Sequence, residues 1–474
     1  MKKKQKKTLS VFLLAMMNVA IVLSLRGLPL MAKEGSSLVF YLVFSLIIFL
    51  IPTALVSAEL ASGWPEEGGV FRWVTEAFGE KTGFTAIWLQ WMQNIFWYPT
   101  ILAFAAGALA YLFFTPELAA NPLYNIAVIL VIYWGSTLIN LRGMKASGWL
   151  ASSGVILGTI LPAIFIIGLG ILWWLSGKPL EFISNSKSFI PDFSNFSNLS
   201  LLAGIILLFA GMEVNAVHVH DVKNPKRSFP KAIFLAVGII FIIFFLGSLS
   251  VAAVVPEEEI SLTAGIMQAF AELLKLFHMH WLLPVVGLLL AYGTIGGVAA
   301  WIVGPSKGIF ATSKLGLIPP FLSRTNKAKV PASILIVQGI IVSFISLIYL
   351  VEPTVSSAFF LLTDLTVILY LIMYILLFAA AIHLRYKRPK VQRSYKIPGG
   401  NFGMWLIAGI GILGALFAIF VGFFPPSQLT FTHPQFYISF LGIGVILALV
   451  LPQIIYGMRK PSWKRKAKEI HHVK

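Results

Sequence analysis

Long apolar stretches recur along the whole chain, separated by mostly short polar segments. A helix needs about 20 mostly apolar residues to cross the hydrocarbon core of a bilayer. On this rule the pattern predicts twelve membrane-spanning helices. They cover residues 9–32, 38–60, 84–114, 123–141, 149–175, 199–219, 230–254, 281–303, 332–351, 356–384, 403–424 and 435–457. The predicted fold class is therefore an all-α integral membrane protein, with one polytopic domain (1–458) and a basic tail (459–474).

The first span contains a full positive charge. Arg26 stands inside the apolar stretch, and Gly27 and Pro29 follow it; both of these residue types weaken a helix. A charge in a spanning helix is costly and usually functional. A helix that breaks at membrane depth is tolerated only where it faces protein or a water-filled cavity. The pattern therefore predicts a break in helix one beside a polar site.

The sixth span repeats this interruption. Glu213 stands within it, and Gly211 loosens the helix just before. Paired interruptions in corresponding spans of two halves are the best sequence indication of a transporter site. Half-helix N-termini at such breaks offer N–H groups to a carboxylate, while carbonyls at the other half-helix ends can accept hydrogen bonds from an ammonium group. We therefore expect a small zwitterion to bind at the two breaks.

Asp364, in the tenth span, is the third charge within the predicted spans and away from their ends. Arg26 and Asp364 lie at similar predicted depth, so one hypothesis is that they pair across the outer mouth of the site as a gate. Other interpretations remain open. Arg26 could extend to the outer headgroups, Glu213 could bond exposed backbone N–H groups rather than act in gating or proton transfer, and Asp364 could be a neutral acid.

The third span carries a polar and aromatic stripe. Gln93, Asn94 and Trp97 fall on neighbouring helical positions, and a wet, aromatic surface suits a small zwitterion. We expect Gln93 and Trp97 to shape the pocket for the substrate's side chain. For Gln90 we favour interhelical hydrogen bonding.

Composition supports a membrane protein and excludes several kinds of site. The chain is 58% hydrophobic and 11% charged, whereas soluble domains have roughly 25% charged residues. It has no Cys, which excludes disulfides, thiol catalysis and Cys-based metal sites. Nothing resembles a nucleotide-binding loop, a zinc motif or a nucleophile elbow. We therefore expect no enzyme activity, no cofactor and no metal.

The net charge of +18 can be interpreted from where Lys and Arg lie along the chain. With the N-terminus inside, the predicted cytoplasmic segments hold 31 of the 36 basic residues and the outer segments hold 4. Because Lys and Arg accumulate in cytoplasmic loops, we expect both termini in the cytoplasm and the chain in the cytoplasmic (inner) membrane. The charge then indicates topology and contact with anionic lipids, and not a nucleic-acid partner.

Several stretches resemble the glutamate/γ-aminobutyrate antiporters of the amino acid–polyamine–organocation superfamily. The similarity extends over nearly all of residues 8–458. The matching stretches are Glu66–Phe71, Phe189–Ser194, Gly211–Glu213 with His218, Asn224–Pro225, Ala264–Gln268, Trp301–Ser306, Ile397–Gly400 and Phe424–Pro426. The resemblance implies two inverted five-helix repeats, about 9–175 and 199–384, followed by two extra helices, about 403–457.

The resemblance also implies a central site between helices one, three, six, eight and ten. Backbone at the two breaks would bind the substrate's amino and carboxylate groups, and helices three and eight would shape its side-chain pocket. The residues concerned are Val22, Leu23 and Ser24 in helix one, Gln93 in helix three, Ala210, Gly211 and Met212 in helix six, and Gly297 in helix eight. Glu213 matches a glutamate of the family.

The chain departs from these antiporters at three positions. Arg26 stands where they carry a tyrosine, Gly297 where they carry a glutamate, and Asp364 where they carry a small residue. The tail is also shorter than the tail that plugs the cytoplasmic mouth of those antiporters. In the wider fold an arginine of helix one and an aspartate of helix ten form an outer gate, which favours the Arg26–Asp364 pair by analogy. Losing an acid and gaining an arginine predicts an anionic or neutral substrate rather than a cationic one.

Together these features predict a secondary active transporter of amino acids or their derivatives that works by alternating access. Exchange of two amino acids is favoured over proton-coupled symport in the same fold. Two alternatives come from other classes: a channel, which would show flux without saturation or counterflow, and a receptor, which would bind an amino acid without flux. The paired helix breaks favour a transporter over both.

Overall fold

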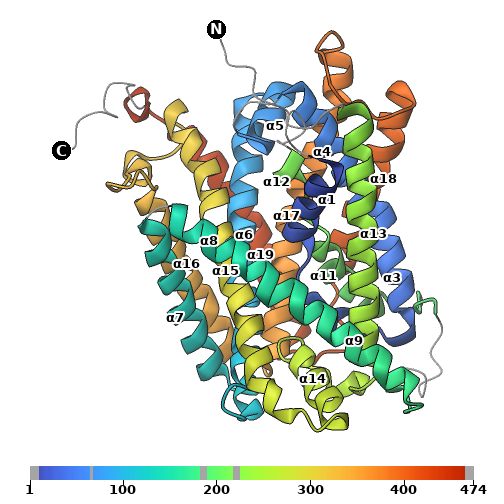
Figure 1. Ribbon diagram of the computed structural model, residues 1–474. Helices are drawn as coiled ribbons and strands as arrows, with labels where there is room; N and C mark the ends of the chain where they lie inside the picture. Colours follow the sequence, from blue (N-terminus) through green and yellow to red (C-terminus); the bar gives the residue numbers. More distant parts are fainter. Residues whose placement is uncertain (1–9, 65–67, 143, 182–188, 217–224, 465–474) are drawn as a thin grey trace.

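The computed structural model describes residues 10–64, 68–142, 144–181, 189–216 and 225–464, and the chain in these ranges is built from helices and their connections (Figure 1). The last part of the predicted tail, 465–474, and His218 lie outside the described residues. Each of the twelve predicted spans coincides with helical structure. The predicted all-α membrane fold is confirmed.

The helices of the first five spans begin and end as follows. They are α1 (Val11–Val22), α2 (Gly27–Ala32), α3 (Leu38–Ser45), α4 (Ile51–Gly63), α5 (Val70–Phe78), α6 (Glu80–Leu109), α7 (Pro122–Leu141), α8 (Met144–Val155) and α9 (Leu161–Leu175). Single π-helical turns join α3 to α4 and α8 to α9. Pro52 and Pro162 are the second residues of the α-helices that follow these turns. Since a proline has no N–H to give to a helical hydrogen bond, each of these wider turns lies where that bond is missing.

The remaining helices complete the bundle. They are α11 (Leu201–Leu208), α12 (Met212–Ala216), α13 (Pro225–Ala252), α14 (Gly265–Leu276), α15 (Leu283–Thr312), α16 (Ala332–Ile345), α17 (Val355–Lys387), α18 (Gly400–Gly422) and α19 (Pro434–Gly457). α15 continues past the predicted end of the eighth span, at 303, through the more polar residues that follow. The apolar rule detects only the part of a helix that lies in lipid.

Ten helical segments in the described ranges are long and apolar enough to cross a membrane by themselves. The first span is absent from this set because its break divides it into two short helices. The third span, α6, is absent although it is 30 residues long. Its polar side chains, including Gln90, Gln93 and Asn94, lower its mean hydropathy, and they are buried inside the protein. A spanning helix can carry such residues where they face the interior.

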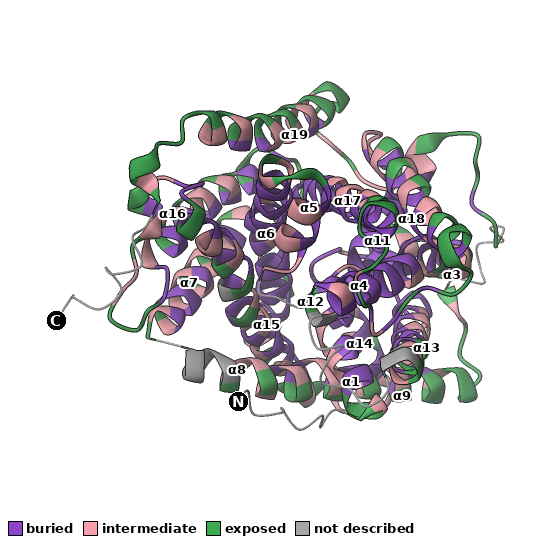
Figure 2. Cartoon of the chain, turned by 90° about the horizontal axis from the view of Figure 1, so that it is seen from above, coloured by how far each residue is buried: buried purple, intermediate pink, exposed green. Residues whose placement is uncertain are grey.

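Three long helices, α6, α15 and α17, form the centre of the molecule. α6 packs against both α15 and α17, and all three are largely buried in the view along the bundle (Figure 2). α11 and α12 lie beside this centre, α1 lies nearer the rim next to α9 and α13, and α7, α16 and α19 lie at the edge. α5 lies at one end of the bundle and α14 at the other (Figure 1). We call these the α5 end and the α14 end.

The α8–α9 span and α15 cross with their backbones in contact. A Cβ atom on Gly158 would stand 2.3 Å from the Cα atom of Gly293 and 2.4 Å from the carbonyl oxygen of Leu289. Only glycine fits at this crossing. Small residues at a helix crossing let two membrane helices approach closely.

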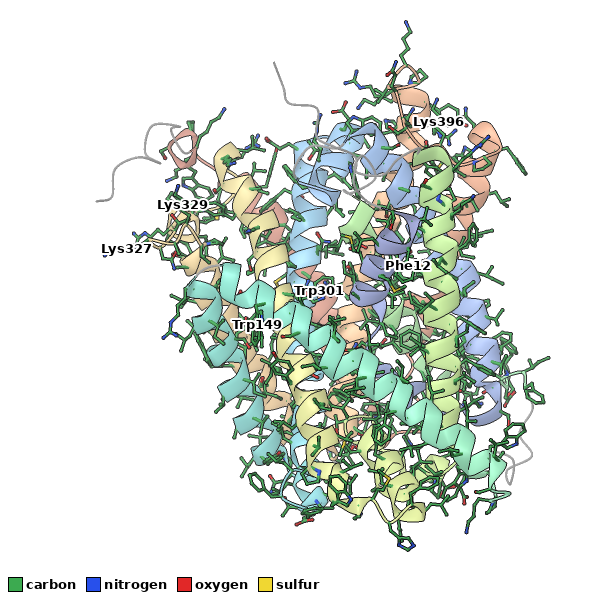
Figure 3. The ribbon with its side chains drawn as sticks, in the orientation of Figure 1. Phe12, Trp149, Trp301, Lys327, Lys329 and Lys396 are labelled. Carbon is green, nitrogen blue, oxygen red and sulfur yellow. The ribbon has the colours of Figure 1, made fainter. Side chains whose placement is uncertain are left out.

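The outer surface of the bundle is apolar between two polar ends. Trp149 and Phe12 are 71% and 64% exposed on the sides of the bundle. Lys327, Lys329 and Lys396 lie towards the α5 end (Figure 3). An apolar belt of this kind is what a lipid-facing surface requires.

Candidate functional site

The first element of the site is the break in helix one. α1 ends at Val22, Leu23 is extended (φ −69°, ψ 115°), and α2 begins at Gly27. Among the described residues, no backbone carbonyl accepts a hydrogen bond from the N–H groups of Ser24 and Leu25. The predicted break near Val22, Leu23 and Ser24 is confirmed. It leaves backbone donors available at membrane depth, and it also frees carbonyl groups in the last turn of α1.

The second element is the break in helix six. α11 ends at Leu208, and α12 begins at Met212. Between them Gly211 has φ 114°, a backbone conformation that residues with a side chain rarely adopt. The predicted break at Ala210, Gly211 and Met212 is confirmed.

A small central cavity of about 60 Å³ lies between the two breaks, α6, α15 and α17. It is lined by Ile21, Val22, Ser24, Arg26, Gln93, Asn94, Trp97, Leu207, Leu208, Ala210, Trp301 and Tyr370. Six predicted site residues are therefore brought together here: Val22, Ser24, Arg26, Gln93, Trp97 and Ala210. Leu23, Gly211 and Met212 lie in the breaks but do not line this cavity.

Gly297 of α15 lines neither this cavity nor the larger one described below. A Cβ atom at this position would nevertheless meet no heavy atom within 4 Å. The position therefore has open space in which a larger side chain could stand. Whether it shapes a substrate pocket stays a prediction.

Arg26 is a buried cation at the edge of the central cavity. Its side chain is 4% exposed, so it does not extend to the surface. Nη1 donates a hydrogen bond to the hydroxyl of Thr100 at 2.8 Å, and Nε has no hydrogen-bond partner. The guanidinium carbon lies 6.0 Å from the ring centre of Trp97 and 5.6 Å from that of Phe359. No carboxylate of the described residues forms an ion pair with this arginine.

The expected pair between Arg26 and Asp364 is wrong for this conformation. Asp364 accepts a hydrogen bond from Tyr437 of α19 at 2.7 Å, whereas Arg26 contacts Phe359 on another face of α17. Residues five apart in a helix point about 140° away from each other. Arg26 and Asp364 were predicted at similar depth in the membrane, but Arg26 lies against a different face of α17 and the two do not pair. Asp364 is fully buried and lines neither cavity.

Glu213 is held by three hydrogen-bond donors just after the break in helix six. Tyr370 donates to Oε1 at 2.5 Å, Gln90 donates to the same oxygen at 3.2 Å, and Tyr374 donates to Oε2. The hydroxyl of Tyr374 also accepts a hydrogen bond from the N–H of Gly211 at 3.0 Å. Interhelical bonding by Gln90 is therefore confirmed. Through this one acid, α6 and α17 are tied to the broken helix.

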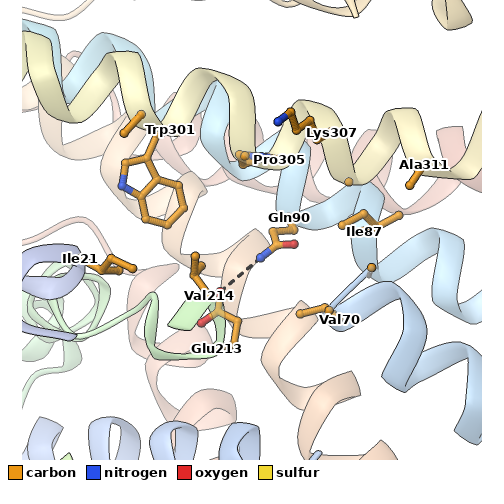
Figure 4. Close-up of a pocket in the computed structure, with 15 residues that line it drawn as sticks. Ile21, Val70, Ile87, Gln90, Glu213, Val214, Trp301, Pro305, Lys307 and Ala311 are labelled. Carbon is orange, nitrogen blue, oxygen red and sulfur yellow. Dashed lines mark hydrogen bonds between the residues drawn. The ribbon is translucent and has the colours of Figure 1, made fainter. Parts of the chain in front are cut away.

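A second cavity, of about 660 Å³, extends from Glu213 towards the α5 end (Figure 4). Gln90 and Glu213 line it on one side, and exposed Lys307 lines it further along α15. Ile21 and Trp301 line both cavities, so they stand between them. The two cavities are therefore neighbours, and Ile21 and Trp301 form part of the wall that they share.

We expect Tyr374→Phe to slow transport about tenfold. The substitution leaves the ring in place but removes the donor to Glu213 and the acceptor for the Gly211 N–H. Leaving a buried polar group unpaired costs about 1–3 kcal/mol, and 1.4 kcal/mol corresponds to a factor of ten. Initial rates of substrate exchange in proteoliposomes, at equal reconstituted amounts, would measure this.

The control is Tyr386→Phe, which removes a hydroxyl from an exposed position on the same helix. It should exchange at the rate of the unmodified protein. If Tyr374→Phe also did so, the hydroxyl would have no role in holding the break.

Sequence reasoning missed several residues that complete the site. Tyr370 and Tyr374 were not selected, although their i, i+4 spacing places both hydroxyls on one face of α17. Thr100 shares a face of α6 with Gln93 and Trp97 and could have been added to the polar stripe. Nothing in the sequence alone marked Trp301 as a residue shared by two cavities, because that depends on the packing of three helices.

Comparison with known proteins agrees with this architecture. Residues 7–447 match the family described as amino acid permease. An uncharacterized transporter of Legionella pneumophila is 43% identical over 447 residues, which cover 94% of this chain and 96% of that protein. Two glutamate/γ-aminobutyrate antiporters, both of Lactococcus lactis, are 35% and 36% identical over 473 residues, covering 99% of this chain and 94% of each relative. The chain therefore belongs to the amino acid permease family and is a multi-pass membrane transporter.

Proposed function

We propose that this transporter exchanges amino acids across the membrane by alternating access, with the central cavity between the two helix breaks as its substrate site. The N–H groups freed in helix one suit the substrate's carboxylate, and the carbonyls freed at the end of α1 suit its ammonium. The family and the antiporter relatives support exchange. Helices 9–175 and 199–384 then act as the two inverted repeats, with the two breaks in corresponding positions.

The preferred substrate is an anionic amino acid such as glutamate, with neutral amino acids as the other class accepted. The observation that carries this is Arg26, which is buried beside the central cavity and has no carboxylate partner among the described residues. A buried cation is stabilised by an opposite charge, and a substrate carboxylate can provide one. Glu213, which bonds to Tyr370 of the central cavity's wall, lines the larger cavity instead. A cationic substrate would meet Arg26 at the site.

We propose that the protein lies in the inner membrane and that its α5 end faces the cytoplasm. The predicted cytoplasmic segments hold 31 of 36 basic residues, and Lys327, Lys329 and Lys396 lie towards the α5 end (Figure 3). Lys and Arg are enriched in cytoplasmic loops. In this orientation the larger cavity is an inner vestibule, and the conformation described faces the cytoplasm.

Counterflow in proteoliposomes tests the proposal. Vesicles preloaded with a mixture of amino acids would be given labelled glutamate, glutamine, arginine or agmatine outside. We expect preloading to accelerate saturable uptake of glutamate most, glutamine less, and arginine and agmatine least. A preference for arginine or agmatine would contradict the charge argument. Unsaturable flux would indicate a channel, and binding without flux would indicate a receptor.

A further inference from the structure

Asp364 occupies a closed polar position outside both cavities. It is fully buried where α17 meets α18 and α19. Its Oδ2 atom lies 2.7 Å from the hydroxyl oxygen of Tyr437, and that hydroxyl lies 3.1 Å from the carbonyl oxygen of Gly422. A Cβ atom on Gly422 would stand 2.8 Å from Oδ1 of Asp364. The carboxyl group therefore fills the contact between three helices.

The hydrogen bonds around Tyr437 determine where the protons are. A tyrosine hydroxyl has one hydrogen, yet two oxygen atoms lie within its reach. If Asp364 is ionised, the hydrogen goes to the carboxylate and the carbonyl of Gly422 loses this donor. If Asp364 is protonated, it donates to the hydroxyl oxygen, and Tyr437 donates to Gly422. Only with Asp364 protonated can the Asp364–Tyr437 and Tyr437–Gly422 contacts both be hydrogen bonds.

The charges around Asp364 point the same way. No cation of the described chain forms an ion pair with it, and Oδ1 is buried without a partner. α11 and α18 carry no ionisable side chain at all, and α19 contributes Tyr437. The acids of α4, α5 and α6 bind arginines elsewhere, in the pairs Glu59–Arg385, Glu76–Arg388 and Glu80–Arg459. A carboxylate buried with one hydrogen bond and no cation is strongly disfavoured.

A second acid lies between this position and the α14 end. Glu352 precedes α17, is 5% exposed, and accepts a hydrogen bond from the N–H of Thr432 at 3.4 Å. Its Oε1 atom is buried without a partner. Burial raises the pKa of Glu352 above its usual range. An acid of this kind takes up a proton more readily than one in water.

We propose that Asp364 is a proton-binding site, separate from the substrate cavity and reached from the α14 end past Glu352 and Tyr437. In the conformation described, the carboxyl group holds the proton. When α17 moves against α18 and α19, the contact with Tyr437 opens, and the proton leaves Asp364 for Glu352 or water. The carboxylate binds a proton again when the helices close. This goes beyond amino-acid exchange, because it couples the cycle to a proton whichever amino acid is carried.

Infrared difference spectra between the unmodified, reconstituted full chain and its variants test the site without a substrate. A protonated carboxyl in a dry environment gives a carbonyl stretch that a carboxylate lacks. We expect this band at neutral pH in the unmodified protein, and its loss in Asp364→Asn. The matched control, Thr363→Val, removes a neighbouring buried hydroxyl but no titratable group and should keep the band. A band that is absent from the unmodified protein, or unchanged in Asp364→Asn, overturns the proposal.

A transport assay then tests whether the proton on Asp364 moves during the cycle. Vesicles carrying an internal pH indicator would be given a mixture of the common amino acids and γ-aminobutyrate, with and without a pH gradient. We expect proton movement with amino-acid flux in the unmodified protein and in Thr363→Val. Asp364→Asn should show exchange at equal pH but no proton movement. Proton movement that persists in Asp364→Asn identifies Asp364 as a permanently neutral structural acid. Failure of exchange in the unmodified protein would overturn the proposed function, while the infrared result would stand by itself.

Discussion

Replacing Arg26 by alanine is expected to lower the exchange of glutamate by a factor of about 30 or more. The guanidinium group is buried beside the central cavity, and Nε has no partner within the described chain. Removing one partner of a buried, hydrogen-bonded charge pair costs about 2–5 kcal/mol, and 2 kcal/mol is about a 30-fold change in affinity. The effect should appear mainly as a rise in the half-saturation concentration for glutamate. Glutamine, which brings no second carboxylate, should be affected much less.

Saturation curves for glutamate and glutamine in the same vesicle preparation would measure this difference. Arg142→Ala is the matched control, because it removes an arginine that is exposed at the end of α7. It should leave both curves unchanged. Equal losses for glutamate and glutamine in Arg26→Ala would mean that the arginine supports the structure around Thr100 and Trp97 rather than binding a carboxylate.

The positions of the helices could be predicted because the bilayer gives each span a simple requirement of length and hydrophobicity. The two breaks could be predicted because they leave local marks: a charge next to Gly and Pro in helix one, and Gly211 before Glu213 in helix six. The glycine and proline residues in these marks act on the backbone itself. The family resemblance, rather than these marks, identified the residues at the breaks, and Val22, Ser24 and Ala210 among them line the central cavity.

Partners across helices were harder to predict, because they depend on how each helix is rotated about its axis. Similar depth, and analogy with the wider fold, suggested that Arg26 faces Asp364, but the face of α17 that carries Asp364 packs against α18 and α19. The hydrophobic pattern does not specify this rotation, since α17 is apolar on nearly all sides and buried on most of them. Glu213 was recognised as an important acid, whereas its donors Tyr370 and Tyr374 were not, because they come from another helix.

Replacing Glu59 by glutamine is expected to destabilise the protein by about 3–5 kcal/mol, the usual cost of removing one partner from a buried ion pair. Glu59, on α4, is 1% exposed and accepts hydrogen bonds from Arg385 at the end of α17 and from the N–H of Ile397, the latter at 2.8 Å. Nε of Arg393 lies 3.5 Å from the same carboxylate. Burial lowers the pKa of Arg393, and the charge of Glu59 opposes that shift. With glutamine, two buried guanidinium groups lose their counter-charge, and an amide N–H₂ faces other donors.

Melting temperatures in one detergent would measure this loss of stability. The matched control is an ion pair at the same end of the bundle. Glu76 also binds arginines, Arg388 at 2.9 Å and Arg72 at 3.1 Å, but these are 53% and 36% exposed. An exposed pair contributes at most about 1 kcal/mol, so Glu76→Gln should shift the melting temperature only slightly. The double variant Glu59→Gln with Arg385→Gln should lose less than the sum of the two single losses, because the partners interact. If Glu59→Gln melted at the temperature of Glu76→Gln, the buried cluster would not hold α4, α17 and the segment after it together.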